Sequence, residues 1–529
     1  MKKGLKKVAL LLAGLSVFAA AGCSGGEEND GKQTLKITVS NLGFGTKWLY
    51  EIADAFEEIY DVNVKITSTV IATDLLKQLE TGYQLDDLCM FAGANYVWTP
   101  LRKGMYIQID DIWNTTIEGE SCTIAEKTFD VFRDAYQHKG HYYSMPFLTE
   151  ISGFGYNATT LDTLLGEGQW KKPKTTDELT ALCERVKDAG GYAFTWSNKE
   201  NSCYWMMLCD VWEAQYNTAD YYNHLKKAQI WDEESGSYVL DLEGKVIEQN
   251  KGLLKAAEVA YPYINKDYGF SHQYSTSMTF VESQAAFAAV PYANDKKLVA
   301  FTPTGSWLYE ESMEDIEYKL QEVGFMNAPL VSALSEKCSY YATNKNYKDL
   351  SVAEKRAYDK ALSAIVAYVD GDVTEKPTTV GNITVKDEDI ELVREARAIA
   401  RTKDQAHAFI PKNSKNPELA KEFLKFFASD YAGELYSNVT HGFSPFYTKI
   451  TDGNKDFMNR FDKEVAEVIN ATSNKINAYI GVGFNLSAIN WEYTFFNGDE
   501  GVVNRAYENY ISTNKRYWND KLRSAGLLN

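Results

Sequence analysis

Aromatic side chains beside strand ends are the residues of this sequence whose types and spacing suggest chemistry. The apolar run at 298–301 ends in a Pro-containing turn, after which Gly305-Ser306 presents Trp307 to a strongly acidic stretch. An indole placed in this way either fills a hydrophobic core or forms a flat platform for a ligand, since its large apolar ring carries one polar N–H. The elements around it have to decide between the two.

The motifs that could indicate catalysis or metal binding either lie in the wrong structural context or lack residues that the chemistry requires. The GxSxG pattern at 22–26 precedes the folded part and does not sit on a strand-to-helix turn. The sequence has no HExxH, and its six histidines show no ligand spacing except His138 and His141, which flank a Lys-Gly turn. Residues 452–463 begin like a calcium loop but lack its glycine and its bidentate glutamate. We therefore predict no catalytic residue, no metal and no cofactor.

The first 33 residues have the pattern of an export signal followed by a tether. Four lysines precede an apolar stretch, Val8 to Ala21, that is shorter than the about 20 residues a membrane span needs. Small residues before Cys23 resemble a bacterial lipobox, so residues 1–22 are expected to be a lipoprotein signal peptide and Cys23 the lipidated residue. The alternative is an ordinary secreted protein with a chance cysteine. Residues 23–33 are polar and are expected to form a flexible tether. The predicted location is the outer face of the cell membrane, with lipid as the only attachment.

Composition narrows the class of partner and the number of domains. The formal net charge is −18, and removing the four signal lysines takes it to −22. Nucleic acid is excluded as a partner because its binding relies on basic side chains that neutralise phosphates. About 495 residues follow the tether, more than one compact domain usually holds, so two or more lobes are expected.

Hydrophobic periodicity predicts a β-α-β unit at the start of the folded part. Apolar residues alternate over 35–39 and again over 62–66, and between them a helical pattern begins after Thr46, a candidate helix cap. Ligands in sheets of this type bind beyond the carboxyl ends of strands, so the loop 41–47 is a candidate site. The strand predicted at 87–91 ends in a second such loop, which carries Asn95 and Trp98.

Later segments add helices and one region without a clear pattern. Helices are predicted at 176–189 and 250–261, and another starts at Pro417 after the candidate cap Asn416. Residues 332–404 are charged, with few large apolar side chains, and are read as an elaboration.

The order of these features resembles the extracellular solute-binding proteins of ABC importers, in the carbohydrate-binding group that includes maltose-binding protein. The chain is longer than usual for that group, and residues 331–404 have no clear counterpart in it. The stretches that carry the resemblance are the lipobox at Cys23, the β-α-β start at 35–66, residues 87–92 with 101–111, residues 140–146 with 155–157, residues 286–307, and residues 410–427 with 442–445.

The resemblance implies a two-lobed α/β fold of the type II-like periplasmic-binding-protein kind. Each lobe would have a central sheet flanked by helices, and a hinge would join the lobes. Lobe 1 is expected at 34–145 plus 325–415, and lobe 2 at 146–324 plus 416–529.

Candidate ligand-binding residues follow from the chemistry of a sugar and from the family. Sugars have C–H faces and hydroxyl edges, which suit aromatic platforms combined with a few hydrogen-bonding groups. The family places a stacking tryptophan at the motif of Trp307. A core position is the alternative for each tryptophan and a solvated surface position for the acid. The other candidates are Asn95, Trp98, Trp48, Phe44, Trp196, Trp205, Glu150, Gly442 and Phe443.

The sequence thus predicts a monomeric, lipid-anchored binding protein that is not an enzyme. It would capture a carbohydrate, with an oligosaccharide favoured, in an interlobe cleft and deliver it to the permease subunits of an ABC transporter. Two alternatives stay open: a binding protein for another solute such as a peptide or polyamine, and a secreted glycoside hydrolase. The hydrolase would need two carboxylates about 5–10 Å apart, which spacing in the sequence cannot establish.

Overall fold

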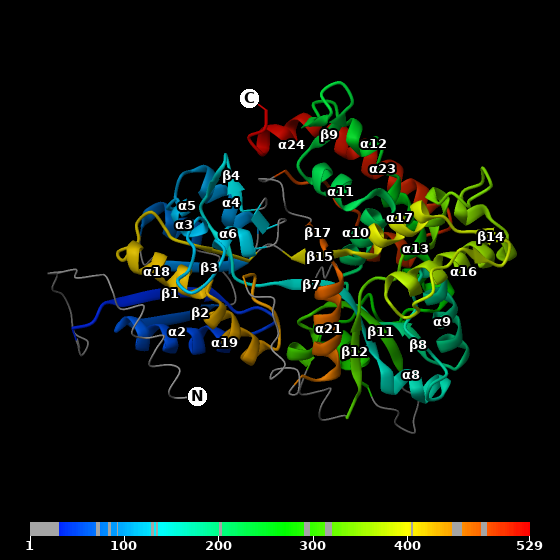
Figure 1. Ribbon diagram of the computed structural model, residues 1–529, viewed down its shortest axis with the longest axis horizontal. Coiled ribbons are helices and arrows are strands. Elements are labelled where there is room, and N and C mark those ends of the chain that lie inside the picture. Colours follow the sequence, from blue (N-terminus) through cyan, green and yellow to red (C-terminus); the bar gives the residue numbers. More distant parts are fainter. Residues whose placement is uncertain are drawn as a thin grey trace. The chain divides into compact units, whose positions relative to one another are not determined.

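The protein forms two compact units (Figure 1). The computed structural model describes residues 31–69, 75–82, 86–92, 94–128, 132–133, 136–199, 204–289, 297–312, 320–403, 406–446, 458–477 and 484–528. Unit 1 contains the described residues up to Thr149 and those between Asp404 and Asp456, and unit 2 contains the rest. The predicted signal peptide, Cys23 and nearly all of the predicted tether lie outside the described residues.

Unit 1 is built on a five-stranded mixed sheet. Its strand order is β2 (Asn63–Thr69), β1 (Thr34–Ser40), β3 (Leu88–Ala92), β16 (Ala406–Phe409) and β6 (Met145–Pro146). β1 runs parallel to both β2 and β3, while β16 is antiparallel to β3 and β6. Leu35, Ile37 and Val39 are all fully buried, which confirms the alternation read from the sequence.

Helices from both ends of the chain cover this sheet. Aromatic rings join α18 to α2, because Phe423 lies 5.1 Å from Phe56 and Phe427 lies 5.9 Å from Trp48. Figure 1 shows the gold α18 and α19 beside the blue α2. The helices are α2 (Lys47–Tyr60), α3 (Leu75–Thr81), α4 (Ala94–Arg102), α5 (Asp110–Trp113), α6 (Ile124–Lys127), α18 (Pro417–Phe427) and α19 (Asp430–Thr440), with a short hairpin of β4 (Gln137–His138) and β5 (His141–Tyr142).

Two residues that were predicted to cap helices with their side chains do not do so. The helices begin where the sequence placed them, but neither Thr46 nor Asn416 caps with its side chain. The Asn416 amide instead donates to the Thr34 carbonyl at 3.2 Å and to Asp87 Oδ2 at 3.2 Å. It therefore fastens the start of α18 to the beginnings of β1 and β3.

Unit 2 contains a six-stranded sheet around a completely buried strand. Its order is β17 (Asn474–Asn477), β15 (Ile399–Lys403), β7 (Glu150–Asn157), β11 (Val299–Gly305) and β8 (Tyr192–Phe194), and β12 (Val323–Met326) also pairs with β7. All eight residues of β7 are buried. β7 is antiparallel to β11, β12 and β15, and β11 is parallel to β8.

A large helical layer completes unit 2. α10 packs along α13, with Trp205, Trp212 and Tyr263 in one aromatic core. The elements are α8 (Ala158–Leu165), α9 (Thr176–Asp188), α10 (Tyr204–Asn217), α11 (Ala219–Lys226), β9 (Gln229–Asp232), β10 (Ser237–Leu240), α12 (Lys245–Glu248), α13 (Lys251–Ile264), η1 (Lys266–Tyr268), α14 (Phe280–Phe287), η2 (Ser332–Lys337), η3 (Tyr347–Asp349), α16 (Val352–Val369), β13 (Thr379–Val380), β14 (Ile383–Thr384), α17 (Asp387–Arg397), α21 (Arg460–Ala471), α22 (Trp491–Phe496), α23 (Val502–Arg516) and α24 (Trp518–Ser524).

The predicted lobe boundaries are wrong for two segments. Residues 325–403 were assigned to lobe 1 but belong to unit 2, because β12 pairs along β7 with Met326 opposite Phe154. Residues 416–446 were assigned to lobe 2 but belong to unit 1, because α18 and α19 pack on α2. The first segment of unit 1 ends at Thr149, and the prediction put the first crossing after residue 145.

Residues 331–397 attach to unit 2 through buried polar groups. Ser332 donates to Asp359 Oδ1 at 2.9 Å and accepts from the Asp177 amide at 3.0 Å. Tyr347 donates its hydroxyl to Asp177 Oδ2 at 2.8 Å. Burial, with the negative charge of Asp177 as a second cause, raises the pKa of Asp359 to about 7. Two carboxyl groups thus connect α9 to the elaboration.

This pair makes unit 2 less stable as the pH rises. Between about pH 4 and pH 7 the unfolded Asp359 loses its proton while the folded one keeps it, so the free energy of unfolding falls, by on the order of a few kcal/mol in total. Asp359→Asn keeps the acceptor for Ser332 but has no carboxyl group to titrate. The free energy of unfolding of this variant is expected to fall less steeply with pH, because the folded state no longer holds one proton more than the unfolded state. Urea unfolding followed by circular dichroism across this range measures it. Asp188→Asn, at an exposed position of α9, is the matched control, and an unchanged slope in Asp359→Asn would contradict the assignment.

Candidate functional site

Strand direction defines one candidate edge in unit 1. β1, β2, β3 and β6 all end at the edge where β16 begins, since Ala406 pairs with Ala92 and His407 with Pro146. Side chains that follow parallel strands gather at such an edge, where ligands of open α/β sheets bind. The loop after β1 and the start of α4 after β3 therefore lie where the sequence predicted a site.

Two predicted residues from opposite ends of the chain meet in unit 1. A Cβ atom added to Gly442 would lie 3.6 Å from Phe44 Cε1, in ordinary van der Waals contact. Phe44 follows β1 and Gly442 follows α19, so the fold brings together segments about 400 residues apart. Phe443 beside them is buried. The contact between Phe44 and Gly442 thus places the segment after α19 against the loop after β1.

Trp98 and Asn95 lie on a helix and not on the predicted loop. α4 begins at Ala94, directly after β3. Trp98 is buried with its ring at right angles to that of His407, 5.7 Å away. The side chain of Asn95 lies outside the described part of the structure.

Trp48 occupies the core of unit 1, which favours the alternative reading of this residue. Its ring lies among Phe147, Phe427 and Tyr436, at centroid distances of 6.3, 5.9 and 5.1 Å. The indole Nε1 donates to the Gly45 carbonyl at 3.0 Å. Through this hydrogen bond, the buried Trp48 side chain anchors the loop after β1 to the core of unit 1.

Unit 2 has a corresponding edge. β8, β11, β15 and β17 end, and β7 begins, on the same side of the sheet. Glu150 is the first residue of β7 and pairs with Lys403 at the end of β15. Trp307 follows the end of β11, and the Ser306 amide donates to the Ile151 carbonyl at 2.9 Å. The carboxylate and the indole thus come from neighbouring strands at one edge.

A glycine determines where the Trp307 ring lies. A Cβ atom at Gly305 would fall 2.0 Å from Trp307 Cζ3, so the indole is folded back against the last residue of β11. Ser306 holds the turn, because its hydroxyl accepts from the Ile151 amide at 3.2 Å. The Gly-Ser-Trp motif therefore holds the indole ring in contact with the end of β11.

Trp196 and Trp205 belong to the core of unit 2. Trp196 donates its Nε1 to Ser271 Oγ at 2.7 Å and packs against Phe496. Trp205 is fully buried against Phe154 and Phe194. For both, the structure favours the core alternative.

Sequence reasoning missed Tyr204, which lies beside Trp307, and Phe280, which lies beside Tyr204. Tyr204, at the start of α10, lies 5.9 Å from the Trp307 ring and 5.5 Å from Phe280. Phe280 is positioned by a capping box in which Thr279 and Glu282 bond reciprocally. That Thr-x-x-Glu pattern was visible in the sequence and would have placed the start of α14. Tyr204 had no distinguishing signal in an aromatic-rich stretch.

An unsatisfied hydroxyl lies close to the same edge. Thr304 Oγ1 is buried and has no hydrogen-bond partner among the described residues. It sits one residue before Gly305 on β11. Buried polar groups usually have partners, so this hydroxyl is a candidate for ligand contact.

Each α/β unit thus has aromatic side chains near its strand-end edge, and unit 2 adds the Glu150 carboxylate. The family model of the bacterial extracellular solute-binding proteins matches residues 51–335, and the chain belongs to this family.

Solved structures show the same fold at low sequence identity. The GacH receptor of Streptomyces glaucescens, solved unliganded and with acarbose, is 12% identical, with a TM-score of 0.56 over 93% of this chain and 99% of that one. The solute receptor AcbH, described as preferring β-D-galactopyranose, is 13% identical, with a TM-score of 0.52 over 94% and 98%. The apo form of RafE from Streptococcus pneumoniae is 12% identical, with a TM-score of 0.51 over 96% and 99%. No curated protein matches the sequence.

None of the helices within the described residues is both long enough and apolar enough to cross a bilayer.

Gly305→Ala tests the seating of the indole. Because the added methyl would overlap the ring, we expect Trp307 to shift, with a stability loss of about 1–3 kcal/mol. Near-UV circular dichroism and tryptophan emission should change while the far-UV spectrum stays the same. Gly501→Ala is the control, since its nearest neighbour is the flexible end of Arg505. An unchanged near-UV spectrum in Gly305→Ala would show that the ring lies elsewhere.

Proposed function

We propose that this protein is a lipid-anchored extracellular receptor that captures a carbohydrate and delivers it to the permease of an ABC importer. The observation that carries the proposal is the Trp307 ring, seated on Gly305 next to Tyr204 and on the same strand-end edge as Glu150. An oligosaccharide is favoured over a monosaccharide because aromatic groups occur at the strand ends of both units.

The chemistry of this edge suits a neutral polyhydroxylated ligand. Aromatic faces pack against the C–H face of a sugar ring and tolerate its hydroxyl edge. A carboxylate such as Glu150 accepts hydrogen bonds from hydroxyl groups, and charged acceptors form the stronger bonds. The buried Thr304 hydroxyl supplies a further neutral partner.

Ligand contacts on both units would drive closure. The chain passes from β6 at the edge of unit 1 to β7 at the edge of unit 2, and returns from β15 to β16, so these two of its three crossings leave from strand-end edges. A ligand shifts a population only through its differential affinity for the two states. We infer that a sugar touching both edges favours a closed state by hinge motion, and that no bond of the ligand is broken.

The solved relatives support the sugar class. AcbH is described as a galactopyranose receptor and GacH was solved with acarbose. At 12 and 13% identity these proteins share the fold with this chain, so the ligand class rests on the edge chemistry as well. Localisation rests on the family and on the lipobox at Cys23.

Ligand class is tested by thermal-shift screening. A specific ligand raises the melting temperature by mass action, so a mono- or oligosaccharide should raise it at concentrations well below those at which any amino acid, peptide or polyamine does. The outcome that sinks the sugar assignment is a shift with polyamines or peptides and none with any sugar. Sustained release of new reducing ends from an oligosaccharide would establish the hydrolase alternative.

Trp307→Ala is expected to weaken binding of the sugar identified in that screen by at least about tenfold, because removing a buried aromatic side chain from a binding site costs on the order of 1.4 kcal/mol or more. Isothermal titration calorimetry measures the change. Trp231→Ala is the matched control in the same unit, since Trp231 on β9 is 47% exposed and lies away from the strand-end edge.

The melting temperature and far-UV spectrum of each variant show whether the fold is kept. A folded Trp307→Ala protein with undiminished affinity would make Trp307 a core residue with no role in binding.

A further inference from the structure

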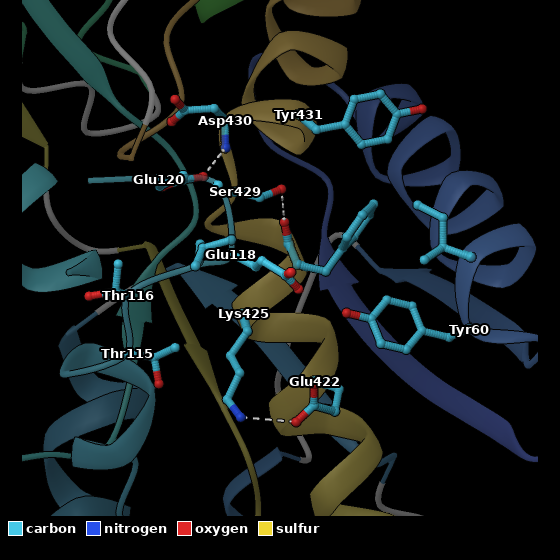
Figure 2. A pocket seen from close by; sticks show the side chains of 14 residues that line it. Tyr60, Thr115, Thr116, Glu118, Glu120, Glu422, Lys425, Ser429, Asp430 and Tyr431 are labelled. Atoms are coloured by element: carbon cyan, nitrogen blue, oxygen red, sulfur yellow. Dashed lines mark hydrogen bonds and ion pairs between the residues drawn. The ribbon is translucent and has the colours of Figure 1, made fainter. Parts of the chain in front are cut away.

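A pocket in unit 1 lies at the far end of α2 from the strand-end edge. Its volume is about 340 Å³, and it is lined by the last turn of α2, the loop at 115–120 and the junction of α18 with α19. Figure 2 shows Tyr60 and Tyr431 on one side and Thr115 and Thr116 on the opposite side. α2 begins beside the loop after β1, and Tyr60 is its last residue, about 20 Å further along at 1.5 Å per residue.

Three aromatic rings form the apolar wall of this pocket. Phe426 lies 6.1 Å from Tyr60 at an interplanar angle of 78°, and 6.1 Å from Tyr431 at 67°. Tyr60 is in turn stacked on Phe56 at 4.3 Å. The edge-to-face contacts set the rings at different angles around the cavity, and such an arrangement presents π faces to a bound group.

Carboxylates predominate among the charged groups at the rim. Glu118, Glu120, Glu422 and Asp430 line the pocket, whereas Lys425 is the one cation among its described lining residues. Lys127, just outside, pairs with both Glu120 and Asp430. Counting both lysines, the acids remain in excess by two.

The single cation within the pocket is itself bound by one of the acids. Lys425 Nζ lies 2.9 Å from Glu422 Oε1, as the dashed line in Figure 2 marks. Burial, with Glu422 as second cause, raises the pKa of Tyr60 to about 12. The negative field of Glu422 thus reaches the aromatic wall. Glu118 is exposed and makes no ion pair within the described residues.

We propose that this pocket is a second binding site, for a small organic cation with an alkylammonium or guanidinium group. The cation would lie against the faces of Tyr60, Phe426 and Tyr431 and face Glu118 and Glu422. Aromatic faces attract cations through their quadrupole, and the attraction is stronger where the group is partly desolvated. A pocket of this volume is at the lower end of the range for small ligands. The site goes beyond the proposed function, and its test needs no sugar.

Binding is measured on the full folded chain by saturation-transfer NMR titration with choline as the probe. 3,3-Dimethylbutan-1-ol, the neutral isostere of choline, is the matched ligand control. We expect saturable binding of choline with a Kd on the order of 1 mM, and at least about fivefold weaker binding of the neutral alcohol.

Three variants localise the site. Tyr431→Leu and Glu422→Gln should each weaken choline binding by about three- to tenfold. Lys425→Met releases Glu422 from its internal partner and should strengthen binding severalfold. Tyr50→Leu and Glu51→Gln, at exposed positions on α2 outside the pocket lining, are the matched controls.

Three results would each overturn the proposal of a cation site. Equal binding of choline and the neutral alcohol would overturn the proposal, because it would show an apolar pocket without charge selection. Choline binding that survives both Tyr431→Leu and Glu422→Gln would also overturn it, and so would the absence of saturable binding in the folded wild-type chain.

Discussion

Close packing around β7 is the constraint on which unit 2 depends. A Cβ atom at Gly153 would fall 2.5 Å from the Met326 carbonyl oxygen, and one at Gly155 would fall 2.5 Å from Leu308 Cδ2. Any larger residue would force apart strands that pair on both sides of β7. The space at Gly155 is filled by Leu308, the residue directly after Trp307. Close packing in the middle of the sheet therefore fixes the turn that carries the indole at its edge, since well-packed interiors leave little room for adjustment.

The elaboration at 331–397 reinforces this unit by means other than a larger sheet. It contributes helices and a two-stranded hairpin, and polar side chains tie it to the start of α9. Arg397 makes a two-point ion pair with Asp370, with distances of 2.9 and 3.2 Å, which closes the end of α17 against the end of α16. The segment also carries more buried apolar side chains than its charged composition suggested, since Leu334, Ile365 and Val393 belong to the core of unit 2. Apolar packing and paired polar groups together order it.

Local elements were predictable because their signals lie in short windows. The period-2 pattern of Leu35, Ile37 and Val39 and the helical pattern after Thr46 both correspond to real elements. Lobe membership failed because it depends on pairing between distant segments. β12 is only four residues long. Its local sequence does not indicate that it pairs with β7, and the charged segment that follows it has a different composition from the rest of unit 2. The exchange of 416–446 has the same origin, since the apolar face of α18 fits any core of suitable shape.

The same limit explains why the tryptophans could not be separated by sequence. Trp48, Trp196, Trp205 and Trp307 are all buried, so burial alone does not distinguish them. The backbone beneath each ring does. Trp48 and Trp196 direct their N–H groups to fixed protein acceptors within their own units, and Trp205 is surrounded by aromatic core residues. Trp307 lies on a glycine at a strand end, at the edge that is proposed to bind the ligand. The absence of a side chain at Gly305 leaves the space in which the Trp307 ring packs, and this makes the ring a candidate platform. The contact between residues 305 and 307 can be recognised only in the three-dimensional structure.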